Sequence, residues 1–272
     1  MGIVGSLLGL VIPALLIWGI VAAVKRGGGH GGAGGSTGSV RTFFQFAGAF
    51  GLLVITCTGL IGVLAQFTVE SNVLVNDPSG AALNRAFVLV GGPLLALMIV
   101  WLRRGIAAEP GMTDTGTATL FITLASILAF SNVLMSTSGI LMWAFGLDDF
   151  FERRTILSAV VWGAAWAALW ITQTKVMPAR RIIPHQALGS LVSAVILLVG
   201  SVMVTSSLLE AALGLRVLIA GPTNAVLLRG VALVIVGGLG WAWYWLGHLA
   251  RESQDTIRLA YVLLAGVGGS LI

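Results

Sequence analysis

The stretch VRTFFQFAGAFGLLVITCTGLIGVLAQ, residues 40–66, has a single charged side chain, Arg41, close to its start. At a rise of about 1.5 Å per residue, the apolar part is long enough to cross the ~30 Å hydrocarbon core of a bilayer as a helix. A helix also pairs every backbone polar group of such a stretch without help from water. The stretch therefore predicts a transmembrane helix.

The rest of the chain has the same character. Of its 272 residues, 57% are hydrophobic and 9% are charged, and the mean hydropathy is +1.01. A soluble domain has roughly 25% charged residues, so this composition excludes an ordinary water-soluble fold. The formal net charge of +5 comes from basic residues scattered between apolar segments. That scatter is typical of membrane topology signals and does not indicate a nucleic-acid partner.

We predict an all-α, polytopic integral membrane protein of about eight transmembrane helices. Short polar segments separate the apolar runs, and the longest of these on the outer side is 67–84. The predicted spans are 3–24, 43–66, 86–102, 118–145, 155–170, 186–209, 230–249 and 256–272.

The chain divides into three parts. Residues 1–26 are an N-terminal anchor without a cleavage pattern, 27–40 a flexible Gly-rich linker, and 41–272 the transmembrane domain. An outside N-terminus places most basic residues on the inner, cytoplasmic face, as expected for a bacterial cytoplasmic membrane. The inner set is Lys25, Arg26, Arg41, Arg103, Arg104, Lys175, Arg180, Arg181, Arg251 and Arg258.

An internal repeat appears in the helices that run from outside to inside. Each has an Arg near its start and a Trp at the same spacing further on, in the pairs Arg85 and Trp101, Arg154 and Trp170, and Arg229 and Trp245. The spacing corresponds to roughly 24 Å of helix, which predicts an Arg anchor at one membrane interface and a Trp anchor at the other. The domain then reads as repeated hairpins in parallel orientation, 41–104, 113–175 and 183–251, with a partial fourth over 255–272.

A resemblance to a known family lies in the stretches 40–66 and 84–104, with weaker copies from Arg153 and from Arg229. They are similar to an uncharacterised bacterial family of multi-pass membrane proteins, catalogued as a domain of unknown function. The resemblance covers most of residues 40–272. It implies a fold and a membrane location, and no activity.

Few residues offer chemistry. No Asp, Glu, Lys or Arg lies at the middle of a predicted span, which disfavours ion-coupled transport. We expect no catalytic residues, and no metal site because no metal-ligand spacing is present. His185 and His248 fall at the same membrane face and are candidate haem ligands, although a polar interface role is the more common one. Trp162 and Trp166 lie on one helical stripe that could hold a quinone or a lipid tail, although such stripes more often serve helix packing. The cofactor, if any, stays unknown.

Small and polar side chains predict helix contacts. Ala47 with Gly51, and Gly163 with Ala167, are small pairs suited to close packing. The polar patch around Asn132, with Ser126, Ser131, Ser136 and Ser138, predicts hydrogen bonds between helices. Gly237, Gly238 and Gly240 predict close helix contact, with a broken helix as the alternative.

These features predict a non-catalytic protein, not an enzyme, that acts as a structural or accessory subunit of a larger membrane assembly. Its expected partners are the lipid bilayer and other membrane protein subunits. Two alternatives stay open: a transporter or channel for a lipophilic or small neutral solute, and a haem- or quinone-binding subunit of a redox complex.

Overall fold

The computed structural model describes residues 35–68, 78–147, 153–214 and 224–249. All regular elements within these ranges are helices. Six helices are long and apolar enough to cross a membrane, so the expected all-α architecture is confirmed and fits a polytopic membrane protein. The predicted spans 3–24 and 256–272 lie outside the described residues, so the total of eight stays a prediction.

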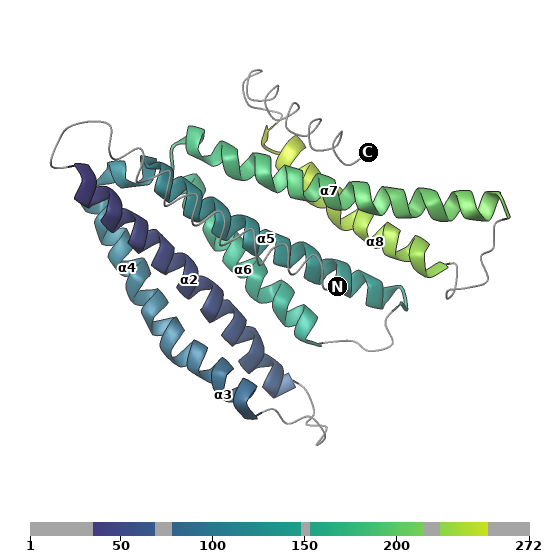
Figure 1. Cartoon of the computed structure of the whole chain (residues 1–272), viewed down its shortest axis with the longest axis horizontal. Coiled ribbons are helices and arrows are strands. Elements are labelled where there is room, and N and C mark those ends of the chain that lie inside the picture. The colour runs from purple at the N-terminus through teal and green to yellow at the C-terminus, as the bar shows by residue number, and fades with distance from the viewer. Residues whose placement is uncertain (1–34, 69–77, 148–152, 215–223, 250–272) are drawn as a thin grey trace.

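The six long helices form three consecutive pairs (Figure 1). Helix α2 lies beside the run formed by α3, a π-helical turn η1 and α4, and a short 3-10 helix η2 leads into α5. Helix α5 lies beside α6, and α7 beside α8, which continues into a second π-helical turn, η3. The bounds are α2 Gly35–Thr68, α3 Pro78–Ala86, η1 Phe87–Gly91, α4 Gly92–Ala108, η2 Pro110–Asp114, α5 Gly116–Ala144, α6 Arg153–Val176, α7 Ala179–Ala212, α8 Asn224–Trp241 and η3 Ala242–Leu246.

The three pairs stack side by side, with the α5–α6 pair in the middle (Figure 1). Helix α2 packs on α5 and α6, and α5 also packs on α7 and α8. Helix α4 lies at the margin, because its extensive helix contact within the described chain is with α2. Apolar clusters fill the contacts between pairs: Phe46, Leu102 and Phe121 in one, and Cys57, Ala129 and Trp162 in another.

Two helical segments are longer than the sequence predicted. Helix α2 begins at Gly35, so residues 35–40 of the predicted linker are helical. Adding one residue to an existing helix gains a hydrogen bond, which offsets the roughly 1 kcal/mol disadvantage of glycine. Helix α3 begins at Pro78, inside the predicted outer segment 67–84. Proline suits the first turn of a helix because the N–H it lacks would have no partner there.

The π-helical turn η1 ends at Gly91, two residues before Pro93, which is the second residue of α4. Proline has no N–H to give to the carbonyl four residues earlier, and its ring clashes with that carbonyl. A wider π-type turn at this point accommodates the missing bond while the run stays helical over Ser79–Ala108.

Helices α7 and α8 approach each other closely through glycines. A Cβ atom added to Gly237 would lie 2.5 Å from the backbone nitrogen of Leu197, and one added to Gly200 would lie 2.7 Å from that of Val234. A Cβ on Gly240 would lie 2.7 Å from Ser193 Oγ. The predicted close contact is therefore confirmed at Gly237 and Gly240, and α8 runs unbroken through both.

Candidate functional site

A chain of hydrogen bonds crosses the interior between the second and third helix pairs. The indole Nε1 of Trp166 donates to the hydroxyl oxygen of Tyr244 at 2.9 Å. That hydroxyl lies 2.9 Å from Nε2 of His185, whose Nδ1 bonds to Oε1 of Gln173. The Gln173 amide donates to Ser126 Oγ. This polar network joins α5, α6, α7 and η3.

The polar network has one consistent direction. An indole N–H can only donate, so Trp166 uses the Tyr244 oxygen as acceptor and leaves the hydroxyl proton for His185 Nε2. The Gln173 amide nitrogen donates to Ser126 and to the carbonyl of Ile122, so the Gln173 oxygen accepts from Nδ1 of His185. These assignments give a neutral His185 with its proton on Nδ1.

The network is almost fully buried. Ser126, His185 and Tyr244 are 0% exposed, and Gln173 is 1% exposed. A buried polar group without a partner costs about 1–3 kcal/mol, whereas a satisfied network is compatible with an apolar interior. The bonds therefore hold one arrangement of the four elements against alternatives that would leave several polar atoms unpaired.

Aromatic rings surround the network. The rings of Phe130 and Tyr244 lie 4.8 Å apart in an edge-to-face contact, and Trp170 packs edge-on against both His185 and Tyr244. Trp243 contacts Trp170 at 6.1 Å. Such edge-to-face pairs contribute about 0.5–1.5 kcal/mol each beyond the area they bury.

The two candidate haem ligands do come together. Trp170 lies between them, with ring centroids 5.4 Å from His185 and 4.7 Å from His248. Both ring nitrogens of His185 are bonded to side chains, and Nδ1 of His248 bonds to the carbonyl of Trp243 at 3.0 Å. Iron ligation at His185 would therefore require breaking the contact with either Tyr244 or Gln173.

The two residues of the predicted ligand stripe have different surroundings. Trp162 is 5% exposed and packs in the apolar cluster with Cys57 and Ala129. Trp166 belongs to the polar network and lies 5.7 Å from the Phe130 ring. Neither lines the two best-formed cavities of the described part of the chain, and both serve packing or hydrogen bonding in this structure.

The predicted Arg and Trp anchors differ in exposure, and their place at the membrane interfaces stays a prediction. Each Arg–Trp pair lies on one helical run, so its members are about 24 Å apart along the axis. Trp101 is 45% exposed and lies beneath the Arg41 guanidinium. Trp245 differs, because it is 5% exposed and stacks on Trp241. The basic members, Arg85, Arg154 and Arg229, are all exposed.

The polar side chains predicted to bond between helices do so at some positions and not at others. Ser126 bonds to α6 through Gln173, and Ser136 bonds to Ser158 of α6 at 2.9 Å, which confirms hydrogen bonds between helices. Asn132 instead donates to the carbonyl of Leu128 in its own helix.

The small-residue pairs have looser surroundings. Gly51 has no described atom within 4 Å of an added Cβ, and Gly163 makes only an ordinary 3.9 Å contact with Val133. Within the described residues, neither glycine makes the tight contact expected of it. Their predicted partners, Ala47 and Ala167, are half-buried.

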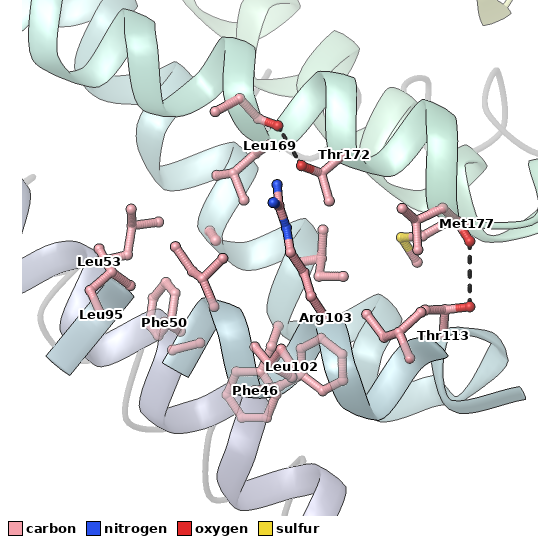
Figure 2. A pocket seen from close by; sticks show the side chains of 18 of the residues that line it. Phe46, Phe50, Leu53, Leu95, Leu102, Arg103, Thr113, Leu169, Thr172 and Met177 are labelled. Carbon is pink, nitrogen blue, oxygen red and sulfur yellow. Dashed lines mark hydrogen bonds between the residues drawn. The ribbon is translucent and has the colours of Figure 1, made fainter. Parts of the chain in front are cut away.

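An apolar cavity of about 290 Å³ lies between α4 and the middle pair, with α2 as one wall (Figure 2). Phe46, Phe50 and Leu53 line it from α2, and Leu169 from α6. Among the described lining residues, only Arg103, Thr113 and Thr172 contribute polar side chains. This cavity could not be predicted from the sequence, because it depends on the small Ala165 and Ala168 lining it opposite α4.

Sequence reasoning also missed Gln173 and Tyr244, which complete the polar network. Gln173 lies beyond the predicted end of the span 155–170, and Tyr244 lies among tryptophans that suggest an interface. The available signal was an uncharged polar side chain on an otherwise apolar helix, which in membranes usually faces another helix.

Comparison with protein-family models, with curated proteins and with solved structures finds no significant match. The resemblance to a family of multi-pass membrane proteins therefore stays a prediction, and the function is argued from the geometry alone.

Proposed function

We propose that the chain is a non-catalytic, multi-pass membrane protein that acts as a structural or accessory subunit of a larger membrane assembly. Its place is the bacterial cytoplasmic membrane, with the N-terminus outside. The observation that carries the proposal is the polar network from Trp166 to Ser126, which joins four elements into one unit and commits the hydrogen-bonding groups of its five side chains to each other.

The same network favours a structural role over the two alternatives. Alternating-access transport requires one helix bundle to rock against another, and such a movement between the second and third pairs would separate His185 from Gln173. A haem-binding role requires a free nitrogen on His185, and both of its nitrogens are bonded.

The margin of the molecule supports the assembly role. Helix α4 presents an apolar face beyond its contact with α2, with Leu97 66% exposed and Leu94 and Val100 also exposed. Either lipid or the transmembrane helix of a partner covers such a face in a membrane. A rigid body with a peripheral apolar helix is suited to hold a neighbouring subunit.

Photo-crosslinking in native membranes tests the proposal. A photoreactive amino acid at Leu97 is expected to crosslink to a single membrane polypeptide that also co-purifies in mild detergent. The matched control places the same probe at Leu239, which is 69% exposed on α8 and belongs to a different helix pair. A chain that purifies as a stable monomer and crosslinks only to lipid from Leu97 would refute the subunit role.

A further inference from the structure

The apolar cavity between α4 and the middle pair has one charged group. Figure 2 shows the Arg103 side chain reaching from α4 across the cavity toward Leu169 and Thr172 of α6. The other two polar side chains already have partners, because Thr172 donates to the carbonyl of Ala168 at 2.7 Å and Thr113 to that of Val176 at 3.4 Å. Only the guanidinium is left to recognise a ligand.

Arg103 has no ion-pair or hydrogen-bond partner in the part of the chain that the structure describes. Nearby Arg181 differs, because its Nε lies 2.9 Å from Oδ1 of Asp114. None of the described residues that line the cavity is a carboxylate. A guanidinium beside apolar walls, with no compensating charge from the described residues, favours an anionic group at that position.

The lining residues lie at different depths along the helix axes, with the charged group at one end and apolar groups further in, as in a lipid. Arg103 lies near the end of α4 at Ala108, and Met177 and Thr113 lie at the corresponding ends of α6 and η2. Leu95, two turns earlier on α4, lies about 12 Å deeper along the axis. The cavity therefore has a charged group near the membrane–water interface and apolar walls toward the bilayer interior.

The volume of the cavity and its opening to the side restrict the kinds of ligand that it can hold. About 290 Å³ lies at the lower end of the range for ligand pockets. A transmembrane helix is about 10 Å wide with its side chains and is too large. Ile99 is 42% exposed at the cavity wall, so a hydrocarbon chain has a route in from the side.

We propose that this cavity binds one acyl chain of an anionic phospholipid, whose phosphate group pairs with Arg103. By the orientation argued above, the lipid belongs to the cytoplasmic leaflet, where anionic lipids attract basic residues. The site does not depend on the subunit role, because lipid fills it whether or not a partner covers α4.

Native mass spectrometry of the full chain in detergent micelles tests the site. Phosphatidylglycerol and phosphatidylcholine with identical oleoyl chains are added separately, and retained lipid is counted per protein. We expect one phosphatidylglycerol to be held about tenfold more tightly than phosphatidylcholine, as for a hydrogen-bonded charge pair. Equal retention of the two lipids would overturn the proposal.

Matched variants separate the head group from the acyl chain. Arg103→Gln is expected to remove the preference for phosphatidylglycerol, whereas Arg104→Gln, which loses the same charge one residue away and outside this cavity, is expected to keep it. Ala165→Phe fills the cavity and is expected to prevent retention of both lipids. If Arg103→Gln and Arg104→Gln behave alike, the guanidinium does not select the ligand and the proposal fails.

A competition experiment tests the acyl-chain assignment with the unmodified protein. Dihexanoyl phosphatidylglycerol has the same head group with short chains, and inorganic phosphate has the charge without any chain. Both are expected to compete far more weakly than the oleoyl lipid, since each buried methylene strengthens binding about fourfold. Full displacement by inorganic phosphate would indicate a simple anion site and overturn the acyl-chain assignment.

Discussion

The hydroxyl group of Tyr244 lies 2.9 Å from Nε2 of His185, a contact that joins η3 to α7 across 59 positions of the chain. The same hydroxyl accepts a hydrogen bond from Trp166 on α6. One oxygen atom thus links three helical segments, which makes it the point where the polar network is most easily broken.

Replacing Tyr244 by Phe removes this oxygen and keeps the ring. Trp166 Nε1, which is partly buried, and His185 Nε2, which is fully buried, then lose their partners. Hydrogen bonds between membrane helices average about 0.6 kcal/mol, but unpaired buried groups cost about 1–3 kcal/mol each. We therefore expect the free energy of unfolding to fall by about 2 kcal/mol, measured by circular dichroism in mixed micelles of increasing denaturing detergent.

The control for this variant is Leu246→Ala. Leu246 belongs to the same π-helical turn and is 56% exposed, so its truncation leaves no polar atom unpaired and is expected to change stability little. If Tyr244→Phe unfolds at the same detergent fraction as Leu246→Ala, the network does not stabilise the fold as argued.

The direction of the network predicts the tautomer of His185. Nitrogen-15 NMR of protein labelled at histidine is expected to show a protonated Nδ1 and an unprotonated Nε2 for this residue, because Tyr244 donates to Nε2 and Gln173 accepts from Nδ1. His185→Gln identifies the signals by their loss. A proton found on Nε2 would contradict the proposed direction of the hydrogen bonds. A haem absorption band that is present in the unmodified protein and lost in His185→Gln would instead support iron binding.

The glycine contact between α7 and α8 supplies a prediction with an internal control. Gly237→Ala places a Cβ 2.5 Å from the Leu197 backbone nitrogen, which cannot move without shifting the helix. We expect a loss of about 1–3 kcal/mol, as for overpacked cores. Gly238→Ala meets only the end of the Leu197 side chain at 3.9 Å, and its better helix propensity, about 1 kcal/mol, is expected to make it neutral or stabilising.

The contrast between these two neighbours is the test. Both variants add one methyl group to the same helix, so differences in hydrophobicity or expression cancel. Thermal unfolding of the two proteins in one detergent would contradict the close contact if Gly237→Ala melted at or above the temperature of Gly238→Ala.

Hydropathy predicts the six described helices because each needs only a long apolar run, which is visible locally. It does not predict where they end. Helix α3 starts at Pro78 and α2 at Gly35, in polar or Gly-rich segments whose helical state depends on the neighbouring span. The similar endings of α5 and α7, with Gly146 and Gly214 at positive φ, follow a local rule, since glycine adopts that conformation without strain.

The polar network and the cavity could not be predicted in the same way. Gln173, His185 and Tyr244 lie on three elements, and only the packing of α6 against α7 and η3 brings their polar atoms together. The cavity arises where Ala165 and Ala168 leave space opposite α4. Both features depend on which helices pack against each other, and that packing is not visible in the local pattern of apolar residues along the chain.

The orientation in the membrane gives the last prediction. Cys57 is the one cysteine of the chain and is 7% exposed, so a cysteine introduced elsewhere is expected to react alone with a maleimide that cannot cross membranes. Leu83→Cys lies near the start of the run Ser79–Ala108 and Ala107→Cys near its end, both at exposed positions. With the N-terminus outside, Leu83→Cys is expected to label in intact cells and Ala107→Cys only after permeabilisation.

Because the two cysteines lie on one helix, each is the control for the other. The reverse pattern would invert the protein, placing Arg103 and the proposed lipid head group in the outer leaflet while leaving the fold unchanged. Labelling of both cysteines in intact cells would contradict the span itself. The positive-inside rule favours the first outcome, since Arg103 and Arg104 lie beside Ala107 and only Arg85 lies beside Leu83.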